Sequence, residues 1–247
     1  MPDFLGIIPA RYASSRFPGK PLAMIRGKPM IQWVYERASE HFDHLLVATD
    51  DPRIKEAVGH FGGRVIMTAV EHRSGTDRCA EALRLYEDQQ KLSFSYVVNV
   101  QGDEPLIMKE QLKELTECVA VPGVEIATLI RPLRDEPLND PNIVKVVVDL
   151  QFRALYFSRA VIPFRKIDAP ESGAPGNSCF KHVGIYAYRS DVLQKIAGFP
   201  PSPLEVIESL EQLRWLENGI GIQTRVTRFP TRGVDTPGDL ERIRDLF

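Results

Sequence analysis

The chain has 247 residues, of which 43% are hydrophobic and 26% charged, and this composition is typical of a globular protein with a substantial core. Its formal net charge of −2 argues against nucleic acid or an anionic membrane surface as a partner. No stretch approaches the roughly 18 apolar residues of a membrane span, and the N-terminal residues lack the basic region of a signal peptide.

The three cysteines, Cys79, Cys118 and Cys179, are widely separated and form no Cys-x-x-Cys pair. Their odd number and their spacing do not indicate a disulfide framework. We therefore expect reduced thiols with no special role, in a protein of the cytoplasm.

The first half of the chain alternates between two patterns. Short apolar runs bounded by Pro, Gly or Asp predict buried strands at Leu5–Ile8, Leu45–Ala48, Val65–Met67 and Tyr96–Val100. Apolar residues at helical spacing predict helices at Pro29–Ala38, Pro52–Phe61 and Asp77–Tyr86. Strand-helix-strand repetition predicts βαβ units on a parallel sheet, which is typical of a nucleotide-binding α/β layer.

The second half is more mixed. The segments Ile143–Leu150 and Ala154–Phe157 predict a hairpin, and Val183–Tyr188 predicts another strand. Pro, Gly, Ser and charged residues are concentrated between Pro163 and Cys179, and they predict a surface loop. A final short helix is expected to begin within Asp235–Asp239.

A further helix is expected to open at Ser202-Pro203-Leu204-Glu205, which supplies an N-cap residue, a first-position proline and an early acid. Continued through Leu216, a single helix would have one apolar and one more polar face. The expected apolar face holds Val206, Leu210, Leu213 and Leu216. The expected polar face holds Glu208, Glu211, Gln212 and Trp215.

The loop after the first strand, from Pro9 to Pro21, contains Arg11, Arg16 and Lys20 together with hydroxyl groups and one glycine. Loops at the carboxyl edge of an open α/β sheet bind ligands, and such a loop can surround a polyphosphate with N–H groups and cations. It does not match the glycine-rich phosphate-loop motif, because Pro21 follows Lys20. Composition alone slightly favours the alternative interpretation, a solvated basic loop.

Eight segments, in order along nearly the whole chain, resemble 3-deoxy-D-manno-octulosonate (Kdo) cytidylyltransferases, also called CMP-Kdo synthetases. The segments are Ile8–Leu22, Val47–Asp50, Ser74–Arg78, Asn99–Pro105, Tyr156–Ala160, His182–Tyr186, Pro201–Arg214 and Gly233–Pro237. The resemblance implies a single domain with a Rossmann-like α/β fold of the nucleotide-diphospho-sugar transferase type. Its central sheet would be mainly parallel, with an inserted β-rich region for sugar binding and dimerisation.

The same resemblance implies approximate boundaries and an activity. About residues 1–130 and 220–247 would form the nucleotide-binding layer, and about residues 131–219 the sugar-binding and dimerisation region. The enzyme would transfer CMP from CTP to Kdo, release pyrophosphate and serve lipopolysaccharide synthesis. A cytoplasmic homodimer is implied, with CTP and an acidic sugar as its partners.

The metal site is implied in the same way. Nucleotidyl transfer needs a divalent cation, and Mg²⁺ prefers one or two carboxylates together with phosphate oxygens and water. By resemblance, Asp103 and Asp235 hold Mg²⁺. The residues alone leave open a turn former at Asp103 and a helix N-cap at Asp235. Glu104 is not assigned, because Pro105 fixes the chain beside it.

By resemblance, Lys20, Arg11 and Asp103 are the catalytic residues, and Lys20 and Arg11 bind the triphosphate with Ser14, Ser15 and Arg16 nearby. The base would be recognised by Pro9, Ala10, Ser74, Gly75, Arg78 and Gln101. An ordinary loop and helix cap remains the alternative for the Ser74 segment, and a capping role is compatible with base binding.

The sugar side is implied to contain Arg159, His182, Tyr186, Glu211 and Gln212. The alternatives left open by the residues are a structural histidine and a solvated helix face. A sialic acid or 8-amino-Kdo cytidylyltransferase would share the chemistry. A nucleotide-sugar glycosyltransferase would more typically show Asp-x-Asp, whereas position 105 is proline. A non-catalytic nucleotide-binding module is disfavoured, because both carboxylates and Lys20 are present.

Overall fold

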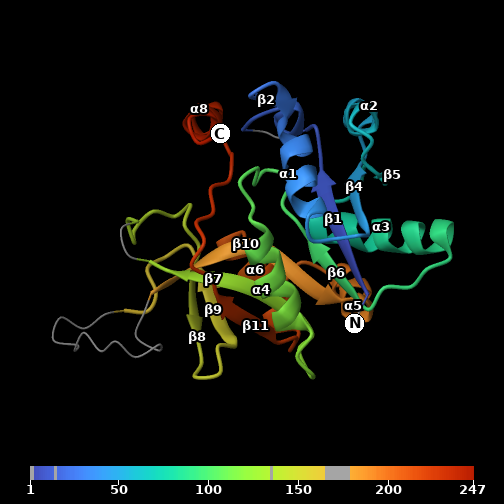
Figure 1. Cartoon of the computed structure of the whole chain (residues 1–247). Coiled ribbons are helices and arrows are strands. Elements are labelled where there is room, and N and C mark those ends of the chain that lie inside the picture. Colours follow the sequence, from blue (N-terminus) through green and yellow to red (C-terminus); the bar gives the residue numbers. More distant parts are fainter. Residues whose placement is uncertain (1–2, 14–15, 134–135, 165–178) are drawn as a thin grey trace. The chain divides into compact units, whose positions relative to one another are not determined.

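The computed structural model describes residues 3–13, 16–133, 136–164 and 179–247 (Figure 1). The chain divides into two compact units. The first unit comprises Met1–Lys113 and Phe229–Phe247, and the second comprises Glu114–Arg228. Most of the predicted Pro163–Cys179 loop, residues 165–178, lies outside the described residues.

The first unit contains β1 (Phe4–Ala10), η1 (Lys20–Leu22), β2 (Met24–Ile25), β3 (Lys28–Pro29), α1 (Met30–Ser39), β4 (Leu45–Thr49), α2 (Pro52–His60), β5 (Val65–Met67), α3 (Gly75–Gln90), β6 (Tyr96–Asn99) and α8 (Pro237–Arg244). Helix α4 (Lys109–Val119) begins in this unit and ends in the second. The four strands and three helices predicted in the first half are all present.

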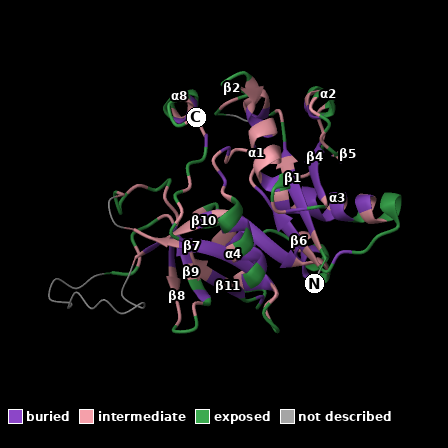
Figure 2. Cartoon of the chain, in the orientation of Figure 1, coloured by how far each residue is buried: buried purple, intermediate pink, exposed green. Residues whose placement is uncertain are grey.

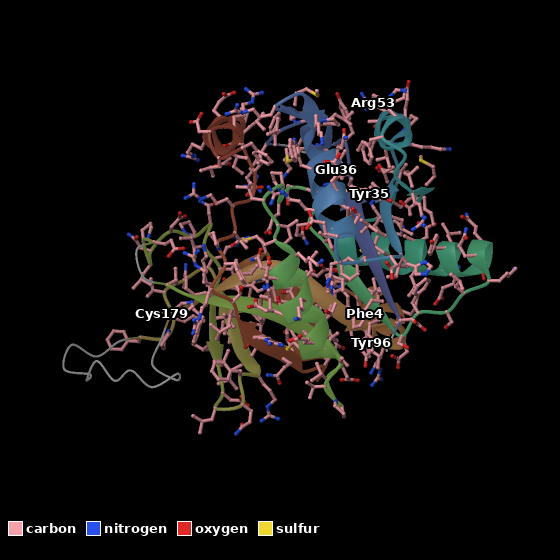
Figure 3. The ribbon with its side chains drawn as sticks, viewed as in Figure 1. Phe4, Tyr35, Glu36, Arg53, Tyr96 and Cys179 are labelled. Atoms are coloured by element: carbon pink, nitrogen blue, oxygen red, sulfur yellow. The ribbon has the colours of Figure 1, made fainter. Side chains whose placement is uncertain are left out.

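The sheet of the first unit has the strand order β6-β1-β4-β5, and each neighbouring pair is parallel. All five residues of β4 are buried, as expected for a strand covered on both faces. Figure 2 shows buried residues following the strands, and Phe4 of β1 stacks on Tyr96 of β6 at 5.1 Å between ring centroids (Figures 2 and 3). Because the strands are parallel, the loops after β1 and β6 leave the same edge of the sheet.

Local capping explains where the helices begin. The Asp51 side chain caps α2 by accepting a hydrogen bond from Arg53 N, and Pro52 occupies the first helical position. Ser74 caps α3 and forms a capping box with Asp77. Thr236, and not Asp235, is the capping residue of α8. The Asp235 side chain is therefore not needed for the helix cap.

The second unit contains β7 (Ile126–Pro132), β8 (Lys145–Val148), β9 (Ala154–Ser158), β10 (Phe180–Arg189), α5 (Ser190–Ala197), α6 (Pro203–Glu208), α7 (Gln212–Glu217) and β11 (Ile222–Val226). Strand β10 is antiparallel to β7 and β8, whereas β11 runs parallel to β7. The predicted hairpin is confirmed by β8 and β9. Strands β7 and β11 and helix α5 were not predicted.

The prediction of one helix from Ser202 to Leu216 is wrong. The chain leaves the helix at Ser209, which has a φ of 52°, and α7 starts at Gln212. This break changes the helical phase, so the expected faces do not form. Val206 is 67% exposed, whereas Trp215, expected on the polar face, is only 1% exposed.

The predicted α/β class, with a mainly parallel sheet and a β-rich second region, matches these elements. Within the described part of the chain, no helix has the length and apolar character needed to cross a membrane.

Candidate active site

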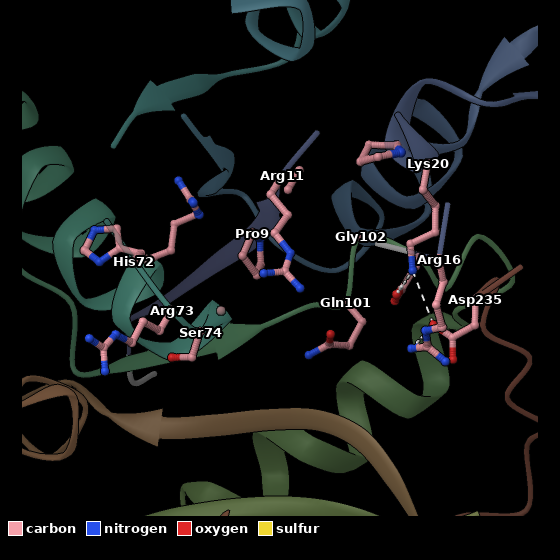
Figure 4. A pocket seen from close by; sticks show the side chains of 15 residues that line it. Pro9, Arg11, Arg16, Lys20, His72, Arg73, Ser74, Gln101, Gly102 and Asp235 are labelled. Atoms are coloured by element: carbon pink, nitrogen blue, oxygen red, sulfur yellow. Dashed lines mark hydrogen bonds and ion pairs between the residues drawn. The ribbon is translucent and has the colours of Figure 1, made fainter. Parts of the chain in front are cut away.

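A cavity of about 330 Å³ lies in the first unit, where the chain leaves β1 and β6 (Figure 4). Its lining consists of Pro9, Ala10, Arg11, Arg16, Lys20, Pro21, His72, Arg73, Ser74, Gly75, Arg78, Gln101, Gly102, Asp103 and Asp235. The cavity is thus built from four separate segments: the loop after β1, the N-terminus of α3, the loop after β6 and the approach to α8.

Every predicted nucleotide-binding residue that the structure describes lines this cavity, and so do both predicted metal ligands. Ser14 and Ser15 lie outside the described residues. The sequence reasoning missed His72 and Arg73. Both residues come directly before Ser74, the N-cap of α3, which was itself predicted to line the site. The sequence could therefore have indicated them, because the chain that enters a helix lies beside the N-terminus of that helix.

Lys20 lies between the two carboxylates that line the cavity. Its Nζ lies 2.5 Å from Asp103 Oδ2 and 3.5 Å from Asp235 Oδ1. Arg16 adds a second cation, with Nη2 3.0 Å from the same Asp235 oxygen. The Lys20 side chain is 13% exposed, against 31% for Asp103 and 50% for Asp235. Two carboxylates distant in sequence therefore share one ammonium group.

A main-chain hydrogen bond brings Asp235 to this place. Val234 N–H donates to Asp103 O at 2.9 Å, which sets the two carboxylate-bearing segments side by side. Val234 is fully buried in a cluster with Ile25, Met30 and Leu240. The burial of such side chains stabilises the attachment by about 1.5–3 kcal/mol each. The burial of Val234 in this apolar cluster therefore holds the neighbouring Asp235 next to Asp103.

Two glycines permit the close approach of the loops. Gly19 adopts a left-handed conformation with a φ of 71°, directly before Lys20. At Gly102, a Cβ atom would lie 3.1 Å from the carbonyl oxygen of Pro9. A side chain at position 102 would therefore require the loop after β6 or the end of β1 to shift by a few tenths of an ångström.

The lining is predominantly basic. Five arginine and lysine side chains line the cavity against two carboxylates, so the charge favours an anionic ligand. In Figure 4, Lys20, Arg16 and Asp235 lie at one end of the view, and His72, Arg73 and Ser74 lie at the other. Arg11 and Gln101 lie between these groups. The cavity therefore has paired cations and a carboxylate at one end, and an imidazole, a guanidinium and a hydroxyl at the other.

Two basic residues of the lining also make internal contacts. Arg78 is buried, with Nη1 2.5 Å from Thr68 Oγ1 and Nη2 3.3 Å from Asp50 Oδ2. His72 Nε2 lies 2.5 Å from Glu81 Oε2, which also accepts a hydrogen bond from Ala69 N. Burial acts to raise the pKa of Glu81, but the hydrogen bonds from the Ala69 main chain and from His72 outweigh it together with nearby cations, and the pKa is lowered.

The second unit brings most of its predicted residues together around an aromatic cluster. His182 and Tyr186 of β10 have ring centroids 5.1 Å apart, and Phe157 packs on His182 at the same distance. Trp215 meets Tyr186 edge-on at 5.0 Å. Trp215 was not among the predicted site residues, because its burial depends on the break between α6 and α7.

The hydrogen bonds of Thr128 define the state of His182. The Thr128 hydroxyl lies 2.7 Å from Ile185 O and 3.1 Å from Val183 O, and it has one hydrogen to donate to these carbonyls. Its oxygen must therefore accept from His182 Nε2, which is 3.0 Å away. Burial lowers the pKa of His182 to about 3. His182 is thus neutral at pH 7, with Nδ1 as an acceptor.

Tyr186 is buried, and its hydroxyl has no hydrogen-bond partner among the described residues. Burial first, and then the carboxylate of Glu211, raise the pKa of Tyr186 well above its ordinary value. Gln212 is buried in the first turn of α7. A buried hydroxyl without a partner is costly, and a polar ligand would satisfy it.

Arg159 differs from this group. Its guanidinium donates to three main-chain carbonyls, those of Glu208 at 2.9 Å, Pro141 at 2.9 Å and Ser209 at 3.3 Å. Its main-chain N–H donates to the Glu208 carboxylate at 2.9 Å. In this structure Arg159 therefore holds the turn after α6, and its donors are directed at the protein.

The two carboxylates of the first unit are placed so that they could hold a divalent cation. They approach one ammonium nitrogen at 2.5 and 3.5 Å, so their oxygens lie close enough to share a cation. Among the described residues there is no group of three or more His, Cys, Asp and Glu able to hold a metal. A site with two protein carboxylates suits Mg²⁺, which takes its remaining ligands from phosphate and water.

The fold and the basic cavity define a nucleotide-binding α/β protein, and comparison with known proteins gives its family. The family model described as cytidylyltransferase matches residues 5–225. A 3-deoxy-manno-octulosonate cytidylyltransferase of Phocaeicola vulgatus is 52% identical over 245 residues, covering 97% of this chain and 95% of the relative. The corresponding protein of Parabacteroides distasonis is 50% identical over 249 residues, covering 98% and 97%.

A solved structure of CMP:2-keto-3-deoxy-manno-octonic acid synthetase in complex with CTP has 46% identity and a TM-score of 0.86, and it covers 99% of this chain and 98% of its own. The chain therefore belongs to the cytidylyltransferase family, and within it to the 3-deoxy-manno-octulosonate cytidylyltransferases.

Proposed function

We propose that this protein transfers CMP from CTP to the anomeric hydroxyl of Kdo, releasing pyrophosphate and giving CMP-Kdo for lipopolysaccharide synthesis. The observation that carries the proposal is Lys20, held between Asp103 and Asp235 in a basic cavity. This arrangement supplies cations for a polyphosphate and carboxylates for a metal, in a chain of the matching family.

In the first unit, Arg11 and Lys20 would bind the triphosphate, with Arg16, Ser14 and Ser15 nearby. Asp103 and Asp235 would hold Mg²⁺, which neutralises phosphate charge when bound. Lys20 is suited to the protein both without and with CTP. Its ammonium pairs with carboxylates when CTP is absent, and the flexible side chain can turn it to phosphate oxygens when CTP is bound. The residues Pro9, Ala10, Ser74, Gly75, Arg78 and Gln101 would recognise the base and adjoining groups.

In the second unit, His182, Tyr186, Glu211 and Gln212 would face the acidic sugar, and Arg159 would hold the turn next to them. Neutral His182 offers Nδ1 to a sugar hydroxyl and cannot pair with the sugar carboxylate as a cation. The hydroxyl of Tyr186 can donate to a sugar oxygen and thereby gain a partner. We propose that the two units work as one catalytic domain.

The reaction is an in-line displacement at the α-phosphorus of CTP. The anomeric hydroxyl oxygen forms a bond to that phosphorus and its proton passes to solvent, while the bond from the phosphorus to the bridging oxygen of the departing pyrophosphate breaks. Lys20 and Arg11 stabilise the negative charge that gathers on the leaving pyrophosphate, and the loops hold the phosphates in line. No protein nucleophile takes part in this scheme.

We further propose that the protein acts in the cytoplasm as a homodimer. The proposal of the cytoplasm rests on the three cysteines, which are free, as is usual in a reducing compartment. Burial raises the pKa of Cys118 to about 11, which makes that thiol unreactive.

The proposal of a homodimer rests on the surface of the second unit, which exposes large apolar side chains at Leu155, Val161, Phe164, Val206 and Ile207. Contiguous exposed apolar patches mark protein–protein interfaces, and these side chains are our candidates for such a patch. Sedimentation of the wild type and of Ile207→Glu tests the dimer.

One assay tests the activity and the sugar. The protein is incubated with CTP, Mg²⁺ and, in turn, Kdo, 8-amino-Kdo or a sialic acid, and pyrophosphate release is measured. We expect release with Kdo. Absence of release with all three sugars would refute the proposed activity, and activity with a sialic acid alone would transfer the protein to that substrate class.

A further inference from the structure

The side chain of Tyr12 connects the two ends of the loop after β1. Gly19 N–H donates to Tyr12 O at 2.9 Å, and a Cβ atom on Gly19 would lie 3.0 Å from Tyr12 Cζ. Arg11 precedes Tyr12, and Lys20 follows Gly19. One aromatic residue thus lies against the backbone next to both proposed triphosphate ligands, although Tyr12 itself does not line the cavity.

Arg53, at the first turn of α2, stacks on the same ring. Its Cζ lies 3.3 Å from the Tyr12 ring centroid. The guanidinium is held in this orientation by Asp51, with Nε 2.9 Å from Oδ1 and Nη2 2.6 Å from Oδ2. Such two-point contact with a carboxylate fixes the guanidinium plane.

The anchor of this contact belongs to the rigid sheet. Asp51 follows β4, which pairs with β1 along its length, and it also caps α2. A continuous set of contacts therefore runs from Asp51 through Arg53 and Tyr12 to Gly19, the residue before Lys20. Cation–π stacking restrains the loop without placing a charge in the cavity.

We propose that Arg53 and Tyr12 form a brace that positions Arg11 and Lys20 for the triphosphate of CTP. Both are positioning residues, and the assignment of the triphosphate rests on the proposed function. Without the brace, only a fraction of molecules holds the loop in its binding conformation, and the apparent dissociation constant rises by the inverse of that fraction. CTP at saturation restores the conformation, so the main effect falls on affinity.

The test compares Arg53→Ala with the wild type. We expect the Kd for CTP, measured by calorimetry, and the KM for CTP to rise by roughly three- to tenfold. The kcat should change less than about twofold, and the KM for the sugar should not change. Arg189→Ala is the matched control, because Arg189 pairs with Asp191 through Nε and Nη2 in the same manner, in the second unit.

Substitutions of Tyr12 distinguish the brace from a general loss of stability. Tyr12→Phe keeps the ring and should bind CTP much as the wild type does, whereas Tyr12→Leu should match Arg53→Ala. The double variant Arg53→Ala/Tyr12→Leu should be no worse than the weaker-binding single variant. Additive losses, or equal losses for Tyr12→Phe and Tyr12→Leu, would overturn the brace.

A second measurement is independent of CTP. Trypsin cleavage after Arg11, followed by mass spectrometry, should be faster in Arg53→Ala and Tyr12→Leu than in the wild type or Tyr12→Phe. Equal rates would overturn the brace even if CTP binds. If the wild type fails to bind CTP, the proposed function fails, and the cleavage rates still decide whether the brace exists.

Discussion

Replacement of Lys20 by methionine removes the ammonium from between two carboxylates while keeping a side chain of similar length. In the wild type this ammonium lies 2.5 Å from Asp103 and 3.5 Å from Asp235, where it competes with any metal ion. We therefore predict that Lys20→Met binds a divalent cation more tightly than the wild type in the absence of CTP, although it turns over more slowly.

The magnitude follows from the distances. A unit charge about 3 Å from another contributes about 1.4 kcal/mol in water and about 5 kcal/mol at an effective dielectric of about 20. Because Asp103 and Asp235 are 31% and 50% exposed, we take the value for water. A change of about 1.4 kcal/mol corresponds to roughly tenfold tighter binding. Loss of the proposed phosphate contact should lower kcat/KM by about 100-fold or more.

The assay is titration of Mn²⁺, followed by the paramagnetic resonance signal of the free ion, without nucleotide. Lys28→Met is the control, because Lys28 also pairs with a carboxylate, at 2.7 Å from Glu36, but lies outside the cavity lining. Adding Asp103→Asn to Lys20→Met should abolish the gain. If Lys20→Met binds Mn²⁺ no better than the wild type, the assignment of Asp103 and Asp235 as the metal pair is refuted.

Three further predictions concern other residues. Asp235→Asn should lower kcat/KM by about 100-fold with little change in the melting temperature, because Thr236 caps α8; normal turnover would contradict the metal role. Tyr186→Phe removes a hydroxyl without a described partner, so its unfolding free energy should equal or exceed that of the wild type while the KM for the sugar rises; an unchanged KM would exclude Tyr186 from the sugar site. The pKa of His182 is lowered to about 3 in the folded protein, so below about pH 6.5 this residue binds more protons in the unfolded chain than in the folded one. The free energy of unfolding therefore falls as the pH falls below about 6.5, by at most about 1.4 kcal/mol per pH unit. Urea unfolding at pH 5 and pH 7 should show a smaller pH dependence in His182→Gln, and an identical dependence would contradict the buried neutral state.

Local patterns in the sequence were sufficient for much of the first unit. The apolar runs that form β1, β4, β5 and β6 are buried on a parallel sheet, where strand identity depends on a few adjacent residues. The predicted position of Asp103 at the sheet edge follows from the same pattern, because a residue just after a parallel strand leaves at its carboxyl end. The structure places Asp103 against Lys20 there.

Local patterns failed where a distant contact decides the outcome. The helix expected through Leu216 breaks at Ser209, and the change of phase buries Trp215 against Tyr186. Helical periodicity cannot anticipate a left-handed residue whose neighbours are held by tertiary contacts. The assignment of Arg159 to the sugar side came from the resemblance and stays a prediction; in this structure its guanidinium donates to three carbonyls of the protein.

The sequence by itself therefore determined the strands β1, β4, β5 and β6 and the helices α1, α2, α3 and α8 of the first unit, the basic loop after β1 and, through resemblance, the family. The resemblance also predicted one metal site for Asp103 and Asp235, but only the tertiary structure shows how Asp235 reaches Asp103 and that both pair with Lys20. A hydrogen bond from Val234 N to Asp103 O and the burial of Val234 create that pairing between residues more than a hundred positions apart. Such contacts depend on the packing of the whole unit, and no local spacing in the chain records them.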